Sequence, residues 1–283
     1  MSLFQYIIKT SLISTLFLKL LLTSAFSQND SVIVVFGDTR TVVSGNAYPN
    51  NFVNKSIIKT LMQFKPLAVF HTGDIVFNGL KKSAWEKFRE FSKSILDNSR
   101  LYPAYGNHEL HSKILSHDFA LPHNGKWYSV DLMNIHFLII DNFSDYKIGS
   151  EQYKWIEHDL KNCNKNAFRV VIMHLPVYSS GPHATQIKKL HKYLVPLFEK
   201  YGVNIVFSAH NHCYERAYSN GIYYITTAGG GAPMYPKTRN IPESQFFVNK
   251  YNFCTLKKIA DNLHIEALDT SLNVIDTFEI KPH

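Results

Sequence analysis

Short apolar runs that alternate with amphipathic segments constrain the fold of this chain more than any other sequence feature. The runs start at residue 31 and are rich in Val, Ile, Phe and Tyr, a composition typical of strands. They cover 31–36, 66–71, 100–105, 127–132, 134–141, 168–174, 204–210 and 221–227. Helices are predicted between several of them, at 51–64, 82–97, 150–161 and 185–200. The order β-α-β-α-β followed by a strand-rich second half predicts an α/β fold.

The end of the chain is predicted to form further strands, joined by tight turns at 260–262 and 270–273. No linker, repeat or low-complexity stretch divides the chain after residue 27. We therefore expect residues 28–283 to form a single catalytic domain.

The first 27 residues have the features of a secretory signal peptide. They contain no acidic residue, Lys9 precedes an apolar stretch, and small residues Ala25 and Ser27 have the spacing of a cleavage site before Gln28. An uncleaved N-terminal anchor is the alternative, which Lys19 within the apolar stretch disfavours. No later stretch is long and apolar enough to span a bilayer, so we expect a secreted or periplasmic protein without a transmembrane segment in its mature chain.

The net charge favours anionic partners without selecting one. It is +8 for the whole chain and falls to +6 when Lys9 and Lys19 are left out. The basic residues are dispersed, so no nucleic-acid partner is indicated. The odd number of cysteines, Cys163, Cys213 and Cys254, fits no metal-binding spacing and would allow one disulfide and one free thiol in an exported protein.

Polar residues that can bind metals recur where the apolar runs end. They are Asp38 in GDTR, Asp74 in TGD, Asn107, His108 and Glu109 in GNHE, His174 after VVIM, and His210 and His212 in AHNH. Because loops at the carboxyl ends of parallel strands converge on one crevice, we expect these residues to meet.

Each member of this set also has a structural interpretation. Asp38, Asp74 and Asn107 are common turn residues, and His174 is compatible with a buried histidine of the core. The His-x-His pair is more specific, because residues i and i+2 of an extended segment point to the same side. Carboxylate, amide and imidazole ligands together suit zinc, iron or manganese.

The series GDTR, GDIVFNG, GNHE, MHLPVYSS and AHNHCYER resembles the calcineurin-like metallophosphoesterase superfamily, and HLPVYSS with HNHCYER is similar to its purple-acid-phosphatase-like branch. The resemblance covers residues 32–232. It implies a four-layer α/β/β/α sandwich with two mixed sheets and two divalent or trivalent metal ions.

The resemblance also implies a role for each residue. Asp74 would bridge both ions; Asp38 and His212 would bind the first ion; Asn107, His174 and His210 would bind the second. His108 would face the substrate as the proton donor to the leaving group, and Glu109 would orient it. The two cations would activate a shared water and neutralise the phosphate oxygens during an in-line displacement.

Two positions depart from the superfamily pattern. A further ligand of the first ion is commonly a histidine two residues after the first aspartate, or, in purple acid phosphatases, a tyrosine three residues after the bridging one. Here these positions hold Arg40 and Phe77, so the first ion would have three protein ligands and no phenolate. An arginine has no lone pair to offer a metal, so Arg40 is predicted to bind a substrate phosphate oxygen or to pair with a carboxylate such as Glu109.

The sequence therefore favours an exported, metal-dependent phosphoesterase. Phosphate monoesters, diesters and pyrophosphate remain open as substrates. The alternative is a phosphate- or polyanion-binding protein on a degenerate scaffold, and an extracellular nuclease is a third possibility. Oligomeric state is not predicted.

Overall fold

The computed structural model describes residues 31–40, 51–110, 112–184 and 186–282. The predicted signal peptide lies outside these residues. None of the helices described in these ranges is long and apolar enough to cross a membrane.

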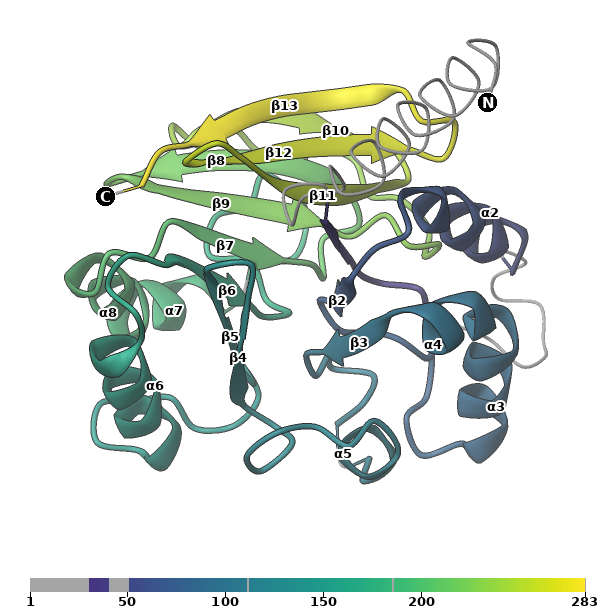
Figure 1. The fold of residues 1–283 in the computed structure, drawn as a ribbon, viewed down its shortest axis with the longest axis horizontal. Helices are drawn as coiled ribbons and strands as arrows, with labels where there is room; N and C mark the ends of the chain where they lie inside the picture. Colours follow the sequence, from purple (N-terminus) through teal and green to yellow (C-terminus); the bar gives the residue numbers. More distant parts are fainter. Residues whose placement is uncertain (1–30, 41–50, 111, 185, 283) are drawn as a thin grey trace, which may run out of the picture.

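The chain forms two mixed β-sheets that pack face to face, with helices on their outer sides (Figure 1). The first sheet has the strand order β13-β12-β11-β1-β2-β3. Its strands are β1 (Val32–Phe36), β2 (Ala68–His71), β3 (Arg100–Pro103), β11 (Asn252–Ile259), β12 (Asn262–Asp269) and β13 (Val274–Ile280). β1, β2 and β3 run parallel, and β11, β12 and β13 extend the sheet beyond β1, each antiparallel to the strand before it in the sheet.

The second sheet has the order β10-β8-β9-β7-β6-β5-β4. Its strands are β4 (Tyr128–Leu132), β5 (Ile135–Ile139), β6 (Phe168–Ile172), β7 (Ile205–Ser208), β8 (Tyr214–Ser219), β9 (Ile222–Thr227) and β10 (Ser244–Val248). Its centre, β5-β6-β7-β9, is parallel. The predicted α/β sandwich with two mixed sheets is confirmed.

Helices flank both sheets. They are α2 (Asn51–Leu61), the 3₁₀ turn η2 (Met62–Phe64), α3 (Lys82–Phe91), α4 (Lys93–Asn98), α5 (Ile114–Asp118), α6 (Glu151–Asn162), α7 (Ile187–Tyr193) and α8 (Val195–Lys200). In Figure 1, α2 to α4 cover the outer side of the first sheet and α6 to α8 that of the second.

Two predicted helices are each divided in two. The predicted helix 82–97 is interrupted at Ser92, whose hydroxyl donates to the carbonyl oxygen of Phe88 one turn earlier, a bond that bends helices. The predicted helix 185–200 is divided at Leu194, where α7 ends and α8 begins. Pro196 lies in the first turn of α8, where proline is tolerated. α3 and α4 still cover the first sheet together, and α7 and α8 still cover the second.

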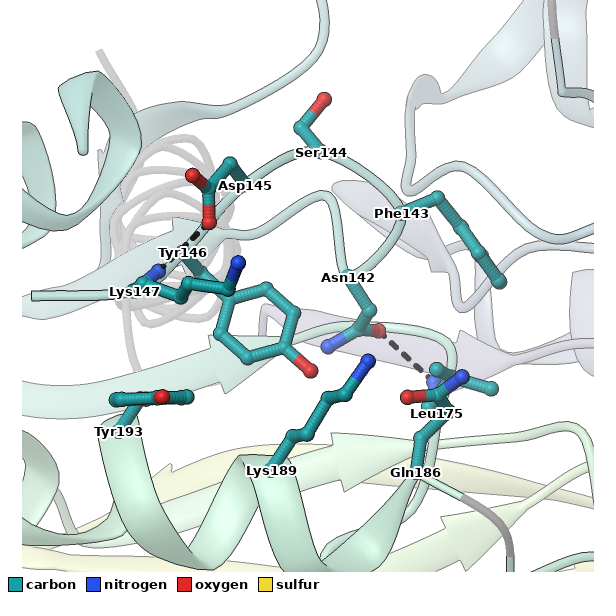
Figure 2. Close-up of a pocket in the computed structure, with 10 residues that line it drawn as sticks. All are labelled: Asn142, Phe143, Ser144, Asp145, Tyr146, Lys147, Leu175, Gln186, Lys189 and Tyr193. Carbon is teal, nitrogen blue, oxygen red and sulfur yellow. Dashed lines mark hydrogen bonds between the residues drawn. The ribbon is translucent and has the colours of Figure 1, made fainter.

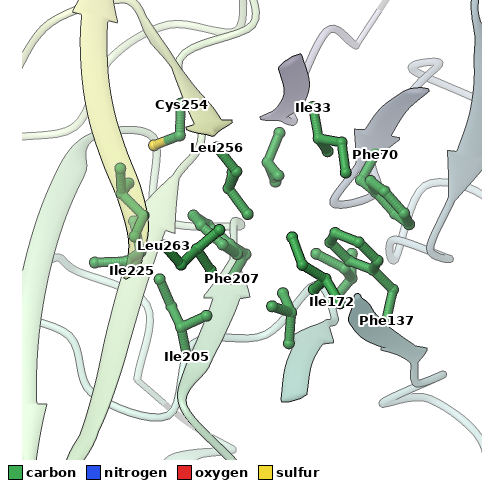
Figure 3. Packing of buried hydrophobic residues seen from close by; sticks show 14 of the residues in the cluster. Ile33, Phe70, Phe137, Ile172, Ile205, Phe207, Ile225, Cys254, Leu256 and Leu263 are labelled. Carbon is green, nitrogen blue, oxygen red and sulfur yellow. The ribbon is translucent and has the colours of Figure 1, made fainter. Parts of the chain in front are cut away.

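The alternation of side chains along the strands explains why both faces of the central strands are apolar. In β1, Ile33 and Val35 point into the core between the two sheets, whereas Val34 and Phe36 pack against the helices. Figure 3 shows the core between the sheets, where Ile33 and Phe70 of the first sheet face residues of the second such as Phe137. Strands buried on both faces are apolar throughout, as these are. This packing holds the carboxyl ends of β1, β2 and β3 beside those of β6 and β7.

Candidate metal centre

The predicted ligands lie where parallel strands of the two sheets end. Asp38 follows β1, Asp74 follows β2, Asn107 follows β3, His174 follows β6, and His210 and His212 follow β7. Backbone hydrogen bonds join the loops: the N–H of Asp38 donates to the oxygen of Gly73, and the N–H of Ala209 to that of His174. The structure thus brings all six predicted ligands to one edge of the sandwich.

His174 lies at the centre of the cluster predicted to hold the second ion. Its Nε2 is 3.2 Å from Asn107 Oδ1, 3.2 Å from His210 Nδ1 and 3.5 Å from Asp74 Oδ1. Single ligand atoms of Asp74, His174 and His210 all lie within 4.8 Å of one another. This spacing fits the ligand shell of one cation.

The tautomer of His174 supports this interpretation. Its Nδ1 is 2.9 Å from the carbonyl oxygen of Thr72, which can only accept, so Nδ1 carries the proton. In the neutral ring, Nε2 then presents a lone pair to the oxygens of Asn107 and Asp74, which are acceptors too. Acceptors that converge in a buried site call for a cation between them.

The electrostatics agree with a cation site. Burial, and then the neighbouring His174, lower the pKa of His210 to about 3, so that its ring is neutral and can bind a metal. Burial opposes ionisation of Asp74, but His174, His108 and Arg40 hold its pKa below the usual value. Asp74 is therefore a carboxylate.

Asp38 and His212, predicted for the first ion, also contact one another. Asp38 Oδ1 is 3.2 Å from His212 Nε2, and Asp38 Oδ2 accepts the backbone N–H of His210 at 3.2 Å. His212 Nδ1 donates to the carbonyl oxygen of Pro233 at 2.6 Å, which directs Nε2 into the site. Among the described residues, none donates a hydrogen bond to the buried Asp38 Oδ1.

Three of the predicted ligands have strained backbones. Asp38, Asp74 and His210 have φ angles of 59°, 55° and 67°, in the left-handed region that residues with a Cβ seldom adopt. Such strain persists only where the surroundings enforce it, and it concentrates at functional sites.

Glu109 fixes the loops that carry Asp74 and Asn107. It is buried, and its carboxylate accepts three backbone N–H groups: Asp74 at 2.9 Å, Gly106 at 3.0 Å and Val76 at 3.0 Å. Burial and the neighbouring Asp74 raise its pKa to about 8, while the three N–H groups oppose this shift. Within the described part of the chain, these backbone groups are its hydrogen-bond donors, and neither His108 nor Arg40 donates to it.

Glycine is required at position 106 by the close approach of these loops. A Cβ there would lie 2.2 Å from the backbone nitrogen and 2.3 Å from Oδ1 of Asp74. The triple glycine 229–231 serves a similar purpose, since the N–H of Gly230 donates to the oxygen of Gly37, just before Asp38.

Arg40 and His108 lie on the other side of Asp74. The Nε of Arg40 and the Nε2 of His108 are each 3.7 Å from Asp74 Oδ2. The guanidinium also contacts His108 Nε2 and lies 3.5 Å from His212 Nε2. Of the two partners predicted for Arg40, a carboxylate is therefore present, but it is Asp74 and not Glu109.

Some residues around the centre were not predicted. Asn142 Oδ1 accepts the backbone N–H groups of His174 and Leu175, both at 2.8 Å. Asn142 follows β5 just as the predicted ligands follow their strands, so the same sequence signal could have pointed to it. Tyr235 stacks on His212 with ring centroids 4.2 Å apart, and no sequence pattern indicated this.

Two other features lie apart from the predicted ligands. His71 is buried in the core, where its Nδ1 accepts the backbone N–H of Gly73 and its Nε2 lies 3.2 Å from Thr39 Oγ1, and burial lowers its pKa to about 3. All three cysteines are unpaired, so the possible disulfide is not formed.

A pocket of about 210 Å³ is lined by Asn142 and Phe143, which follow β5, and by Leu175, which follows His174. The ring of Phe143 is 5.9 Å from that of His174. Figure 2 shows Asn142 and Lys189 pointing into this pocket. None of the predicted ligands is among the residues that line it.

Comparison with known proteins identifies the family. The profile of the calcineurin-like phosphoesterases matches residues 28–214. Purple acid phosphatase 21 of Arabidopsis thaliana is 27% identical in an alignment 185 residues long, which covers 56% of this chain and 42% of the plant protein. Probable inactive purple acid phosphatase 1 of the same plant is 29% identical in an alignment 267 residues long, which covers 75% of this chain and 43% of that protein.

A similar fold is found in purple acid phosphatase PPD1 from yellow lupin (Lupinus luteus), with a TM-score of 0.74 and 23% identity over 89% of this chain and 53% of that one. The chain spans less than half the length of the curated relatives named above. The matched profile covers well over half of the residues, and it ends within the AHNHCYER motif. The chain belongs to the calcineurin-like phosphoesterase family, in its purple-acid-phosphatase-like branch.

Proposed function

We propose that this protein is a metal-dependent phosphoesterase that hydrolyses phosphate esters. The observation that carries the proposal is the convergence of Asp74 Oδ1, Asn107 Oδ1, His174 Nε2 and His210 Nδ1 around one position. This set of oxygen and nitrogen ligands suits zinc, iron or manganese. When bound, such an ion lowers the pKa of a water toward neutrality and offsets the charge of phosphate oxygens.

These residues fit the second of the two predicted ions. The first predicted ion fits less well, because the guanidinium of Arg40 lies among its predicted ligands, beside Asp74 and His212. The geometry therefore supports only the second ion of the predicted dinuclear centre.

His108 and Arg40 are proposed to act on the substrate. Both lie beside Asp74 and are only partly exposed, on the side of Asp74 that faces away from His174. Arg40 would hold a phosphate oxygen, and its fixed charge and fork of donors suit that role. Asn107 would share in orienting the phosphate. His108 would donate a proton to the leaving alkoxide, an effect worth about 10²- to 10⁴-fold in rate.

The test is hydrolysis of aryl phosphate monoesters, diesters and pyrophosphate by purified protein supplied with zinc, manganese or iron. We expect product with at least one class, and a His108→Ala rate lower by about 10²- to 10⁴-fold. His117→Ala, which changes an exposed histidine of α5, is the matched control and should keep full activity. Absence of product with every metal, together with identical behaviour of both variants, would refute the proposal.

A second candidate is a phosphate- or polyanion-binding protein without turnover. The position of Arg40 favours it, since a guanidinium between Asp74 and His212 binds anions without a metal. One relative is named as a probable inactive phosphatase, and that name applies to that protein. Anion binding that persists in excess chelator, with no hydrolysis, would support this candidate over the enzyme.

We also propose that the protein is exported, on the strength of the signal-like segment 1–27. Its partner would be a phosphate-ester substrate. N-terminal sequencing of the secreted protein should begin at Gln28.

A further inference from the structure

The two residues that depart from the metal-ligand pattern contact each other. Arg40 follows β1 and Phe77 follows β2, and the guanidinium carbon of Arg40 lies 5.8 Å from the centre of the Phe77 ring. The side chain of Arg40 is 17% exposed. An aromatic face stabilises a partly desolvated guanidinium. The two departures are therefore one local arrangement.

The guanidinium engages two of the three protein ligands predicted for the first ion. Its Nε is 3.7 Å from Asp74 Oδ2, and its Nη1 is 3.5 Å from His212 Nε2. Asp38 is the predicted ligand that it does not contact. Asp38 retains a role in shaping the site, since its Oδ2 accepts the N–H of His210.

The tautomers of the neighbouring histidines match a guanidinium. His212 Nδ1 donates to the oxygen of Pro233 and His108 Nδ1 to that of Phe77, each at 2.6 Å. Both rings, when neutral, therefore present the lone pair of Nε2 to Arg40, which can only donate. Phe77 supports this arrangement twice, through its ring and through its carbonyl oxygen.

We propose that Arg40, supported by Phe77, takes the place of the first metal ion, so that the centre binds a single transition metal ion through Asp74, Asn107, His174 and His210. A metal ion between Asp74 and His212 would compete with the guanidinium for the same lone pairs and would be repelled by its charge. One part of the inference rests on the proposed function, namely that the metal ion and the guanidinium would together hold the phosphate of the substrate.

The experiment counts metal ions. Protein stripped with chelator is reloaded with excess zinc or manganese, freed of unbound metal, and analysed by elemental mass spectrometry. We expect one equivalent per chain for the wild type and fewer than one for His210→Ala. The double variant Arg40→His/Phe77→Tyr offers an imidazole and a phenolate in place of the cation, and we expect it to bind two. Arg89→His/Phe52→Tyr is the matched control on exposed helix surfaces and should bind one.

Manganese paramagnetic resonance gives an independent readout. The wild type should show isolated Mn²⁺, and the Arg40→His/Phe77→Tyr variant an exchange-coupled pair. Two tightly held equivalents in the wild type, or a coupled pair in its spectrum, would overturn the inference, and this holds even if the double variant fails to fold. A wild type with one ion and no esterase activity would sustain the inference and refute the proposed function. Two ions with activity would do the reverse.

Discussion

Replacing Glu109 by glutamine tests whether this carboxylate holds the metal-binding loops together. Glu109 accepts the N–H groups of Asp74 and Gly106 through Oε2 and that of Val76 through Oε1. Glutamine has the same shape but only one acceptor oxygen. In its better orientation it keeps the bonds to Asp74 and Gly106 and turns its NH₂ group toward the N–H of Val76.

The cost follows from that count. One hydrogen bond is lost and one buried N–H is left unsatisfied, which lowers the free energy of unfolding by about 1–3 kcal/mol. Glu109→Ala removes all three acceptor contacts, at about 1–3 kcal/mol for each N–H group left unpaired. That total is comparable to the stability of a typical domain, about 5–15 kcal/mol. We expect the alanine variant to unfold or aggregate.

The assay is urea denaturation of metal-free protein, followed by tryptophan fluorescence and circular dichroism. A second readout is zinc affinity, which should fall about 10- to 100-fold in Glu109→Gln because the loops that carry Asp74 and Asn107 lose a common anchor. Glu90→Gln, on the exposed surface of α3, is the control, and its unfolding free energy should stay within about 0.5 kcal/mol of the wild type. A Glu109→Gln protein with wild-type urea midpoint and zinc affinity would refute this reasoning.

Three further predictions concern the core, the pH response and the metal. Phe207→Ala should lower the free energy of unfolding by about 3–5 kcal/mol, because Phe207 is fully buried between the sheets. The control Phe52→Ala, at an 81% exposed position, should change it by less than about 0.5 kcal/mol. Equal effects of the two variants in urea denaturation would contradict the assigned core. Burial opposes protonation of His136, but hydrogen bonds to Asp159 and Asp131 raise its pKa overall. The stability that His136 provides is therefore present below pH 6.5 and is lost as pH rises through the raised pKa. His136→Leu should lower the free energy of unfolding more at pH 6 than at pH 9, and a loss that is the same at both pH values would contradict this. Chelator should lower the melting temperature, and zinc at about 100 times its dissociation constant should restore about 2.7 kcal/mol; an unchanged melting temperature would argue against a bound ion.

The sequence predicted the architecture well, because the strands that form it are buried on both faces. The run containing β1 is apolar throughout and that containing β6 is apolar except for Arg169, which distinguishes them from the amphipathic helices in between. The predicted bounds differ from the observed ones by a few residues at most for these strands.

β8 and β10 were not among the predicted strands. In β8, the buried Glu215 accepts the N–H of Ser180 and the hydroxyl of Ser244, and Arg216 pairs with Asp276 of β13. Charged side chains obscure the apolar pattern of such a strand, and the partners that allow their burial are distant in the chain. Local periodicity contains no information on those partners.

The sequence alone determined which chemical groups follow the strand ends, and it predicted that they meet, since parallel strands bring their carboxyl ends together in any such sheet. The local strand-and-loop pattern was enough to select the predicted ligands Asp38, Asp74, Asn107, His174, His210 and His212. Only the tertiary structure decided how these groups face one another. The direction of each imidazole lone pair depends on a carbonyl oxygen from a remote loop, as for His174 and Thr72.

Arg40 illustrates the same limit. From the sequence it was equally compatible with a phosphate contact and with an ion pair to Glu109. In the structure, Glu109 is engaged with three backbone N–H groups, and Arg40 lies between Asp74, His108 and His212. A guanidinium interacts over only a few ångströms, so the packing of two sheets and four loops decides which group is its partner. The residues next to Arg40 in the chain do not specify that packing.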